Sequence, residues 1–271
     1  MTDMFALGGK TAFVTGGAGI LGRGFCHMLA ENGARIALVD VTQARAEEAV
    51  AELRAAMPGG DFAALGGNIA DPGEVARMVA QTVAQFGRID ILLNNAATKS
   101  SDLSAFFAPF EEYSLETWRE VMSVNIDAMF LVAQAVGRQM VAQGGGGSMI
   151  KTASIYGVVA PDQRIYEGSH YLGRAINTPA VYSASKAAVI GLARYLSTYW
   201  AEHRIRVNVL TPGGIESGQN DMFSRRYSAR VPMGRMGQSS ELHGALLYLA
   251  SDASSYMTGQ NLVVDGGLTS W

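Results

Sequence analysis

The sequence predicts an α/β protein of the Rossmann-like, doubly wound type: a parallel sheet of about seven strands with helices on both faces. Short apolar runs alternate with longer amphipathic stretches almost from end to end, which is the pattern of βαβ units. The chain has 271 residues, 48% of them hydrophobic, enough for one sizeable core. No proline-rich linker divides it, so we expect a single Rossmann-like catalytic domain over residues 1–271.

The expected elements follow one another in order along the chain. We predict strands near 11–15, 35–39, 61–65, 89–93, 148–153, 205–210 and 261–264, and helices near 20–32, 43–57, 72–86, 115–142, 181–203 and 239–250. Gly33 and Gly87 stand where helices should stop, because glycine tolerates the left-handed conformation at a helix C-terminus. Two segments, about 156–180 and 212–238, do not fit the alternation. Each follows a strand, so we expect substrate loops at the carboxyl edge of the sheet.

Composition excludes several classes of function. The net charge of −3 supplies no basic field for nucleic acid, so a small-molecule partner is expected. The single cysteine, Cys26, lies in an apolar helical pattern and should be a buried small side chain. The four histidines are scattered, so we assign no metal site. No run of 18 apolar residues and no leader pattern is present, which predicts a cytoplasmic protein without a membrane span.

The first expected strand runs directly into a glycine-rich turn. Gly16, Gly19 and Gly22 are spaced three apart in G-G-A-G-I-L-G, and a helical pattern follows. Such glycines allow a tight turn, let the backbone approach a pyrophosphate and let the helix pack closely on the strand. The strand-turn-helix context favours a dinucleotide site over a plain tight turn.

Asp40 stands at the end of the second expected strand, eighteen residues after Gly22. A carboxylate there accepts hydrogen bonds from the adenosine ribose hydroxyls and repels a 2′-phosphate, which favours NAD over NADP. Arg23 is a counter-signal, but it lies inside the expected first helix, and no basic residue stands immediately after Asp40. The alternative is that Asp40 is only a helix N-cap or a solvated turn residue.

Tyr182 and Lys186 are four apart in V-Y-S-A-S-K, at the expected start of a helix, so both side chains lie on one face. A free tyrosine has a pKa of about 10, and a nearby ammonium stabilises its phenolate. The pair therefore suits proton transfer near neutral pH. Two further motifs meet it at the carboxyl edge of the sheet: Ser154 in K-T-A-S, and N-N-A-A at 94–97.

With these motifs the sequence resembles the short single-domain branch of the short-chain dehydrogenase/reductase family. The similarity extends from Thr15 through N-N-A-A, Y-S-A-S-K and R-V-N-V-L-T-P-G-G to T-G-Q-N-L-V-V-D-G-G at 258–267. The resemblance implies hydride transfer between a nicotinamide and a carbon bearing oxygen. It also implies a homo-oligomer, a dimer or tetramer paired through the helices near 115–142 and 181–203.

The resemblance also implies roles for individual residues. Ser154 would polarise the substrate oxygen, Tyr182 would be the general acid/base, Lys186 would lower the pKa of Tyr182 and hold the nicotinamide ribose, and Asn125 would anchor a water in a proton relay. The implied cofactor contacts, beyond Tyr182, Lys186 and Asp40, are Gly16, Gly19, Ile20, Leu21, Asn68, Ile69, Asn94, Asn95, Ala96, Pro212, Gly213 and Ile215. Asn68 and Asn94 have a second interpretation as helix or turn caps.

Three departures from the family pattern stand out. Ile20 occupies a position that is usually glycine in the short branch, and Asn68 occupies one that is usually aspartate, which puts its adenine contact in doubt. Ser154 and Tyr182 are 28 positions apart, about twice the family interval. The extra residues must loop out if the two side chains are to meet.

The extra segment predicts the kind of substrate. Its many hydrogen-bonding side chains favour a polar ligand, because an apolar one would bury unpaired groups at about 1–3 kcal/mol each. We therefore expect a sugar, polyol or sugar acid, with contacts from Tyr156, Arg164, Tyr166, His170 and Gln219. The segment has a second interpretation of equal weight, as a solvated surface excursion or a subunit contact. Two other functions stay open: a reductase of a hydrophobic ketone of the 3-oxoacyl or steroid type, and a non-catalytic dinucleotide-binding protein.

Overall fold

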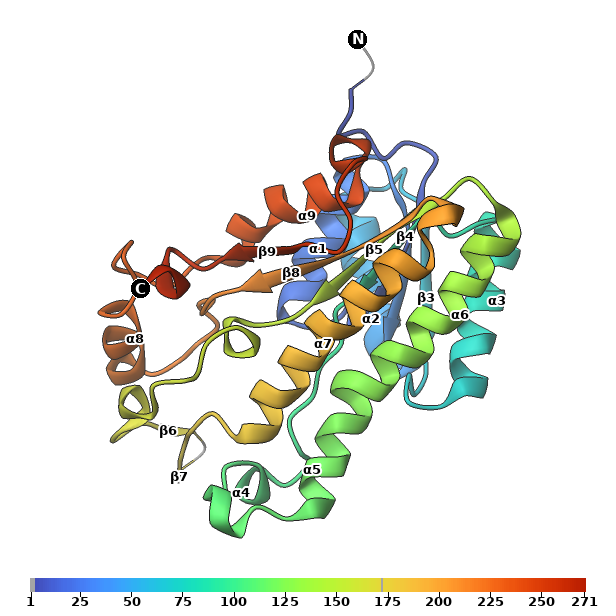
Figure 1. Cartoon of the computed structure of the whole chain (residues 1–271). Coiled ribbons are helices and arrows are strands. Elements are labelled where there is room, and N and C mark those ends of the chain that lie inside the picture. Colours follow the sequence, from blue (N-terminus) through green and yellow to red (C-terminus); the bar gives the residue numbers. More distant parts are fainter. Residues whose placement is uncertain (1–2, 172) are drawn as a thin grey trace.

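The computed structural model describes residues 3–171 and 173–271, and within them seven strands form one parallel sheet (Figure 1). The spatial order is β3-β2-β1-β4-β5-β8-β9. This order confirms the predicted doubly wound fold, because the chain reverses direction across the sheet between β1 and β4. The strands are β1 (Thr11–Thr15), β2 (Arg35–Asp40), β3 (Phe62–Gly66), β4 (Ile91–Asn94), β5 (Gly147–Thr152), β8 (Ile205–Pro212) and β9 (Asn261–Val264).

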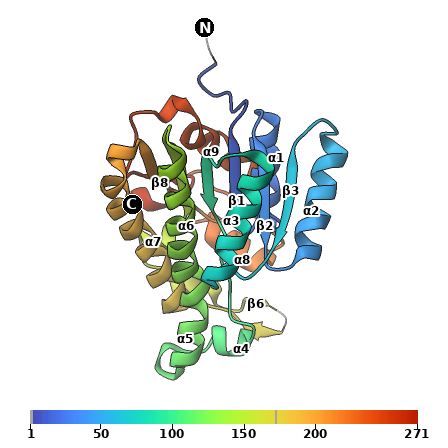
Figure 2. The same ribbon diagram turned by 90° about the vertical axis from the view of Figure 1, so that its right-hand side faces the viewer.

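Helices cover both faces of the sheet, and α3 and α6 lie in front of it in Figure 2. One face carries α1 (Ile20–Glu31), α2 (Gln43–Ala56) and α9 (His243–Ala250), and the other carries α3 (Pro72–Phe86), α6 (Ala128–Gln143) and α7 (Ala180–Tyr199). Alternate strand residues divide between the two core clusters: Phe13 packs with α3 and α6, and its neighbour Val14 packs with α1. Successive side chains of a strand point to opposite faces, which explains why the strands are apolar throughout.

The expected helix boundaries have identifiable caps. The Thr42 side chain accepts a hydrogen bond from the Arg45 backbone at the start of α2, and Asp71 caps α3 with Pro72 in its first turn. Gly87 ends α3 in the left-handed conformation, at φ 81°. Cys26 is fully buried, as expected, and burial raises the pKa of its thiol.

The helix expected over 115–142 is interrupted in the structure. A π-helical turn, Ser123–Asp127, separates α5 (Leu115–Met122) from α6. A π-helical turn contains one residue more than an α-helical turn, and this changes the spacing of apolar residues very little. The sequence pattern therefore did not reveal the interruption. By length and composition alone, Leu115–Gln143 would suffice to cross a membrane. In this fold its buried side chains, Val132 and Val136 among them, pack in the core instead.

The two predicted substrate loops lie at the carboxyl edge of the sheet, and they contain short regular elements that the sequence pattern did not indicate. The first contains short 3-10 turns at Ile155–Gly157 and Gln163–Tyr166, then the hairpin of β6 (His170–Tyr171) and β7 (Arg174–Ala175). The second contains α8 (Asp221–Ser228). The Tyr166 ring stacks on that of Phe223, with centroids 5.3 Å apart. This contact joins the two loops through a third apolar cluster.

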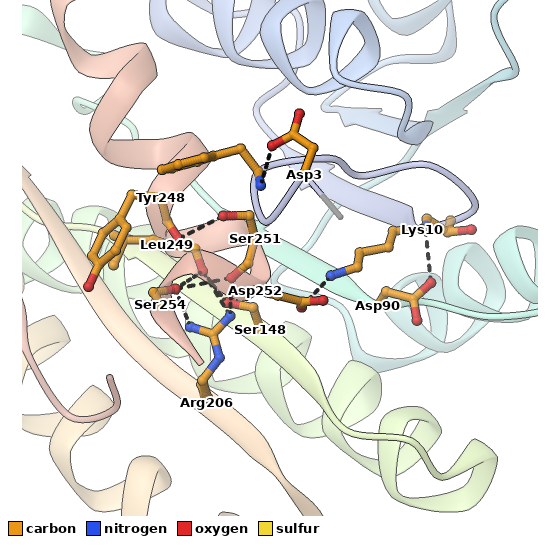
Figure 3. Close-up of polar contacts among 12 residues, drawn as sticks. Asp3, Lys10, Asp90, Ser148, Arg206, Tyr248, Leu249, Ser251, Asp252 and Ser254 are labelled. Atoms are coloured by element: carbon orange, nitrogen blue, oxygen red, sulfur yellow. Dashed lines mark hydrogen bonds and ion pairs between the residues drawn. The ribbon is translucent and has the colours of Figure 1, made fainter. Parts of the chain in front are cut away.

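A polar network fixes the opposite, amino edge of the sheet (Figure 3). The Arg206 guanidinium on β8 donates to the Ser254 hydroxyl at 2.6 Å and to the Ser251 carbonyl at 3.0 Å. The Lys10 ammonium, just before β1, lies 2.6 Å from an Asp252 carboxylate oxygen. These bonds tie the segment after α9 to the sheet, far from the ends of the strands that carry the candidate site.

Candidate active site

A cleft of about 580 Å³ opens at the carboxyl ends of β1 and β4, where the strand order reverses. Open α/β sheets bind ligands at this point. It contains most of the residues expected to hold a cofactor, and three of the four catalytic candidates. Its lining includes Gly16, Gly19, Ile20, Leu21, Asp40, Asn68, Ile69, Asn95, Ala96, Ser154, Tyr182, Lys186, Pro212, Gly213 and Ile215.

The glycine-rich turn forms one wall of the cleft and leads into α1. A Cβ on Gly22 would lie 2.0 Å from the Gly16 carbonyl oxygen, so a larger residue would force α1 away from the turn. Gly19 is the N-cap residue of α1 and has no side chain to fill that end of the helix. Exposed backbone N–H groups at a helix N-terminus suit a pyrophosphate. The turn therefore fits a dinucleotide.

The hydroxyl of Thr15 organises the end of β4. Its Oγ1 accepts hydrogen bonds from the backbone N–H groups of Asn95 and Ala96 at 3.0 and 3.1 Å, and donates to Asn94 at 3.2 Å. Asn94 is fully buried and does not line the cleft; its amide donates to the Met129 carbonyl at 2.9 Å. The expectation that Asn94 lines the cofactor site was therefore wrong, whereas Asn95 and Ala96 do so.

Asp40 is fixed in place at the end of β2. Its carboxylate accepts hydrogen bonds from the backbone N–H groups of Ala18 and Val41, both at 3.0 Å, and is only 7% exposed. It does not cap α2, since Thr42 does. No basic residue stands immediately after Asp40 in the sequence, but the fold supplies one: the Arg45 Nε lies 2.8 Å from the Asp40 Oδ1, and Arg45 lines the cleft. One turn of α2 brings Arg45 back to the strand end.

Asn68 and Arg23 lie in different environments. Asn68 lines the cleft, where a cofactor contact is expected, and its side chain also caps a turn by accepting a hydrogen bond from the Ala70 backbone at 3.0 Å. Arg23, the counter-signal for a phosphate, pairs with Glu48 and Glu52 on α2 and does not line the cleft.

Ser154, Tyr182 and Lys186 meet although the sequence separates the serine from the tyrosine widely. The 3-10 turn after Ser154 lies against α7, and a Cβ on Gly157 would come within 2.6 Å of the Lys186 backbone. Lys186 is 2% exposed and donates from Nζ to the Thr152 carbonyl at 3.1 Å. Its ammonium lies 5.7 Å from the centre of the Tyr182 ring. The extra residues between them loop outward, as the sequence predicts.

Asn125 occupies the π-helical turn behind this group and is fully buried. Its Oδ1 accepts a hydrogen bond from the Thr98 backbone at 2.8 Å, and its Nδ2 lies 3.5 Å from the Ser185 hydroxyl. The side chain thus joins α7 to the loop after β4. Thr98 lines the cleft, and sequence reasoning did not single it out.

Burial sets the electrostatics of the catalytic candidates. It raises the pKa of Tyr182, and the interaction with the Ser154 hydroxyl works in the opposite direction. Burial lowers the pKa of Lys186 to about 8. A cation close to the Tyr182 ring favours the phenolate over the phenol. The arrangement can exchange a proton with an oxygen atom held beside Ser154.

The expected substrate residues are dispersed. Tyr156 and Tyr166 pack together in the third apolar cluster beside Ile155, and their hydroxyls lie 3.4 Å apart. The Tyr166 hydroxyl also lies 2.5 Å from that of Thr178. Of these two, Tyr156 contacts Ser154, because its backbone N–H donates to the Ser154 hydroxyl at 3.2 Å.

The other three expected substrate residues are engaged elsewhere in the structure. Arg164 is largely exposed and pairs with Asp162 at 2.8 Å. The Gln219 side chain donates to the Ile215 carbonyl at 2.9 Å, which closes its own loop. His170 is exposed on β6. Among residues 3–171 and 173–271, no group of three metal-ligating side chains occurs.

A parallel sheet with a dinucleotide-shaped cleft at its switch point, and a tyrosine-lysine pair inside it, defines a class: oxidoreductases that use a nicotinamide dinucleotide. Comparison with known proteins narrows the class. The family model described as enoyl-(acyl carrier protein) reductase matches residues 16–269. The chain belongs to the short-chain dehydrogenase/reductase family and is an oxidoreductase acting on CH–OH groups.

Relatives align over nearly the whole chain. D-threitol dehydrogenase of Mycolicibacterium smegmatis is 36% identical, over 98% of this chain and 95% of the relative. 2-Dehydro-3-deoxy-D-gluconate 5-dehydrogenase of Dickeya dadantii is 34% identical, over 98% and 97%. A gluconate 5-dehydrogenase structure from Burkholderia cenocepacia, in complex with NADP and tartrate, has a TM-score of 0.86 at 34% identity, over 99% and 98%.

Proposed function

We propose that this enzyme transfers a hydride between NAD and a secondary alcohol or ketone of a sugar, polyol or sugar acid. The observation that carries the reaction type is the placement of Ser154 and Tyr182 in one cleft, with Lys186 beside the tyrosine ring. The relatives named above, which act on a tetritol or a sugar acid, support the substrate class.

The chain's own residues would handle the proton and position the substrate. A bound nicotinamide ring supplies or accepts the hydride. The Ser154 hydroxyl holds the substrate oxygen beside Tyr182, whose phenolate oxygen takes the proton during oxidation and whose hydroxyl gives it back during reduction. The Lys186 ammonium stabilises the phenolate between these events. Asn125 holds the loop after β4 against α7, through Thr98 and Ser185, and so keeps the cleft in shape.

We further propose that NAD is preferred to NADP. The Asp40 carboxylate lies in the cleft and is held rigidly by the Ala18 and Val41 backbone, so a 2′-phosphate placed there would meet a fixed negative charge. Arg45 works in the opposite direction, because part of its guanidinium faces solvent beside the cleft. Its Nε is already bound to Asp40, so the guanidinium is less available to a phosphate.

A group of hydroxyls near the cleft favours a polar substrate over a steroid or long acyl chain. The hydroxyls of Tyr156, Tyr166 and Thr178 contact one another, and the Tyr156 backbone N–H donates to the Ser154 hydroxyl of the cleft at 3.2 Å. Hydroxyl groups of a polyhydroxylated substrate would pair with them, whereas an alkyl chain would not. The matched family model is described by an acyl substrate, whereas the relatives that align over nearly the whole chain are named for a polyol and a sugar acid.

The function is tested by following NADH absorbance at 340 nm with a panel of sugars, polyols, sugar acids, hydroxyacyl esters and steroid alcohols. Reduction of NAD by a sugar-type alcohol is the expected outcome. Activity confined to the apolar alcohols would refute the substrate class. Absence of turnover with every alcohol and ketone, together with tight NADH binding, would favour the non-catalytic alternative.

We also propose a dimer or tetramer paired through α5, α6 and α7. These helices carry large apolar side chains on their outer surfaces: Phe130 is 47% exposed, and Tyr195 and Tyr199 are each 63% exposed. The Tyr195 and Tyr199 rings stack with centroids 5.8 Å apart. Such a patch is typical of a protein interface.

A further inference from the structure

Three arginines of the two substrate loops are already bound to protein acceptors. Arg164 pairs with Asp162 at 2.8 Å, and Arg230 approaches the same carboxylate at 3.4 Å. Arg226 on α8 donates to the backbone carbonyls of Arg164 and Glu167. These arginines hold the two loops together and so do not offer a free positive charge to a ligand.

Lys99 differs from these arginines. Among residues 3–171 and 173–271, no carboxylate lies within ion-pair distance of its ammonium. The ammonium lies 4.9 Å from the centre of the Tyr171 ring and 6.0 Å from that of Phe107. Partial desolvation lowers its pKa. Lys99 is exposed, and its ammonium faces two aromatic rings and no carboxylate of the described residues, so it is free to pair with an anion.

The position of Lys99 connects it to the cleft. It follows Thr98, which lines the cleft and whose backbone N–H donates to the Asn125 side chain at 2.8 Å. Tyr171, whose ring faces the Lys99 ammonium, belongs to the β6–β7 hairpin. The same hairpin contacts the start of α8, where the Asn220 amide donates to the His170 carbonyl at 3.5 Å. The hairpin thus reaches from Lys99 to the start of α8, between α4 (Leu103–Phe106) and α8 in Figure 1.

We propose that Lys99 binds a carboxylate of the substrate, so that the enzyme acts on a sugar acid in preference to a neutral polyol. This inference rests on the proposed function and narrows its substrate class. The acid group would enter between the hairpin and the loop after β4, while the reacting carbon lies at Ser154 and Tyr182. A purely structural role for Lys99, holding Tyr171 in place, would affect charged and neutral ligands equally.

The test compares tartrate with threitol of the same stereochemical series. The two share a four-carbon chain and the same inner hydroxyl groups, and they differ only in having carboxylates or hydroxymethyl groups at the ends. Calorimetric titration of each into the protein saturated with NADH should show tighter binding of tartrate. In Lys99→Met, tartrate affinity should fall by about 10- to 100-fold, the loss expected for one charge-assisted hydrogen bond, while threitol affinity should stay the same.

Two further variants act as controls. Lys99→Arg keeps the charge and should retain the preference for tartrate. Lys10→Met removes a lysine from the opposite edge of the sheet, where it pairs with Asp252 (Figure 3), and should change neither affinity. Unchanged circular dichroism and NADH binding would show that each variant is folded.

Three results would overturn the inference: equal loss of both affinities in Lys99→Met, no preference for tartrate in the wild type, or no binding of either ligand at millimolar concentrations. Because binding is measured without turnover, the two proposals can fail separately. Lys99-dependent tartrate binding without oxidation of any sugar-type alcohol would refute only the proposed reaction. Turnover of polyols with no effect of Lys99→Met would refute only the role of Lys99.

Discussion

The ammonium of Lys186 lies 5.7 Å from the centre of the Tyr182 ring, one helical turn further along α7. Both side chains have partners in the protein: the Lys186 Nζ donates to the Thr152 carbonyl at 3.1 Å, and the Tyr182 hydroxyl interacts with the side chain of Ser154. The pair is therefore organised before any ligand binds. Predictions about proton transfer follow directly from this geometry.

Tyr182→Phe should abolish most of the turnover while leaving NADH binding intact. The substitution removes only the hydroxyl that exchanges the proton, and general acid/base catalysis contributes about 10²- to 10⁴-fold to a rate. The measurement is kcat from absorbance at 340 nm, together with a fluorescence titration of NADH. Turnover at the wild-type rate would show that another group handles the proton.

Alcohol oxidation should become faster as the pH rises, because the reaction needs the Tyr182 phenolate and burial raises the pKa of this residue. In Lys186→Met the stabilising cation is gone, so the rise in kcat/KM should move to higher pH by about one unit or more. The profile is measured in the oxidation direction with saturating NAD. A profile that does not move would mean that Lys186 acts only in binding.

Asp40→Ser should shift cofactor preference towards NADP. It removes the fixed negative charge at the ribose end of the cleft and leaves Arg45 free of its 2.8 Å partner. The ratio of kcat/KM for NADP to that for NAD should rise by about tenfold or more, since a charged contact is worth 1.5–3 kcal/mol. The control is Arg45→Met, which removes the only described cation beside Asp40 and should not raise NADP use. An unchanged ratio in Asp40→Ser would contradict the role assigned to Asp40.

Lys151→Met should stabilise the protein, and more so at low pH. Lys151 is fully buried, its Nζ has only the Met129 carbonyl at 3.4 Å, and burial lowers its pKa to about 7. Between that value and the ordinary value of about 10.4, the unfolded chain holds a proton that the folded one lacks, so the burial penalty grows as the pH falls. Below about pH 7 the penalty is complete.

Urea unfolding at pH 6.5 and 9.5 checks this prediction. Replacing a buried charge with an apolar side chain of similar volume should raise the free energy of unfolding by about 1–4 kcal/mol at pH 6.5. The gain should be clearly smaller at pH 9.5. A gain independent of pH would show that packing, rather than the charge, is responsible.

Tyr195→Glu combined with Tyr199→Glu should dissociate the oligomer. The stacked rings are exposed on α7, and two carboxylates there would have to be buried, unpaired, in the proposed interface. Light scattering coupled to size-exclusion chromatography should give a dimer or tetramer for the wild type and a monomer for the double variant. A monomeric wild type would refute the proposed interface.

The sequence by itself determined the sheet, its helices and the main catalytic candidates. Apolar runs such as that of β1 indicate strands that are buried on both faces. Tyr182 and Lys186 are four residues apart, so helical geometry alone places their side chains together. The glycine turn before α1 is equally local. In each case one short segment contains all the information that the prediction needs.

Only the tertiary structure decided contacts between segments that are distant along the chain or lie on different elements. It showed that Arg45 folds back on Asp40, that Asn94 turns inward to Met129, and that a π-helical turn sets Asn125 against Thr98. It also placed Lys99 beside Tyr171, about seventy residues away. Such pairings depend on how the loops pack against the folded sheet. Hydrophobic periodicity and helix or strand propensity describe only a few neighbouring residues, so they do not predict these pairings.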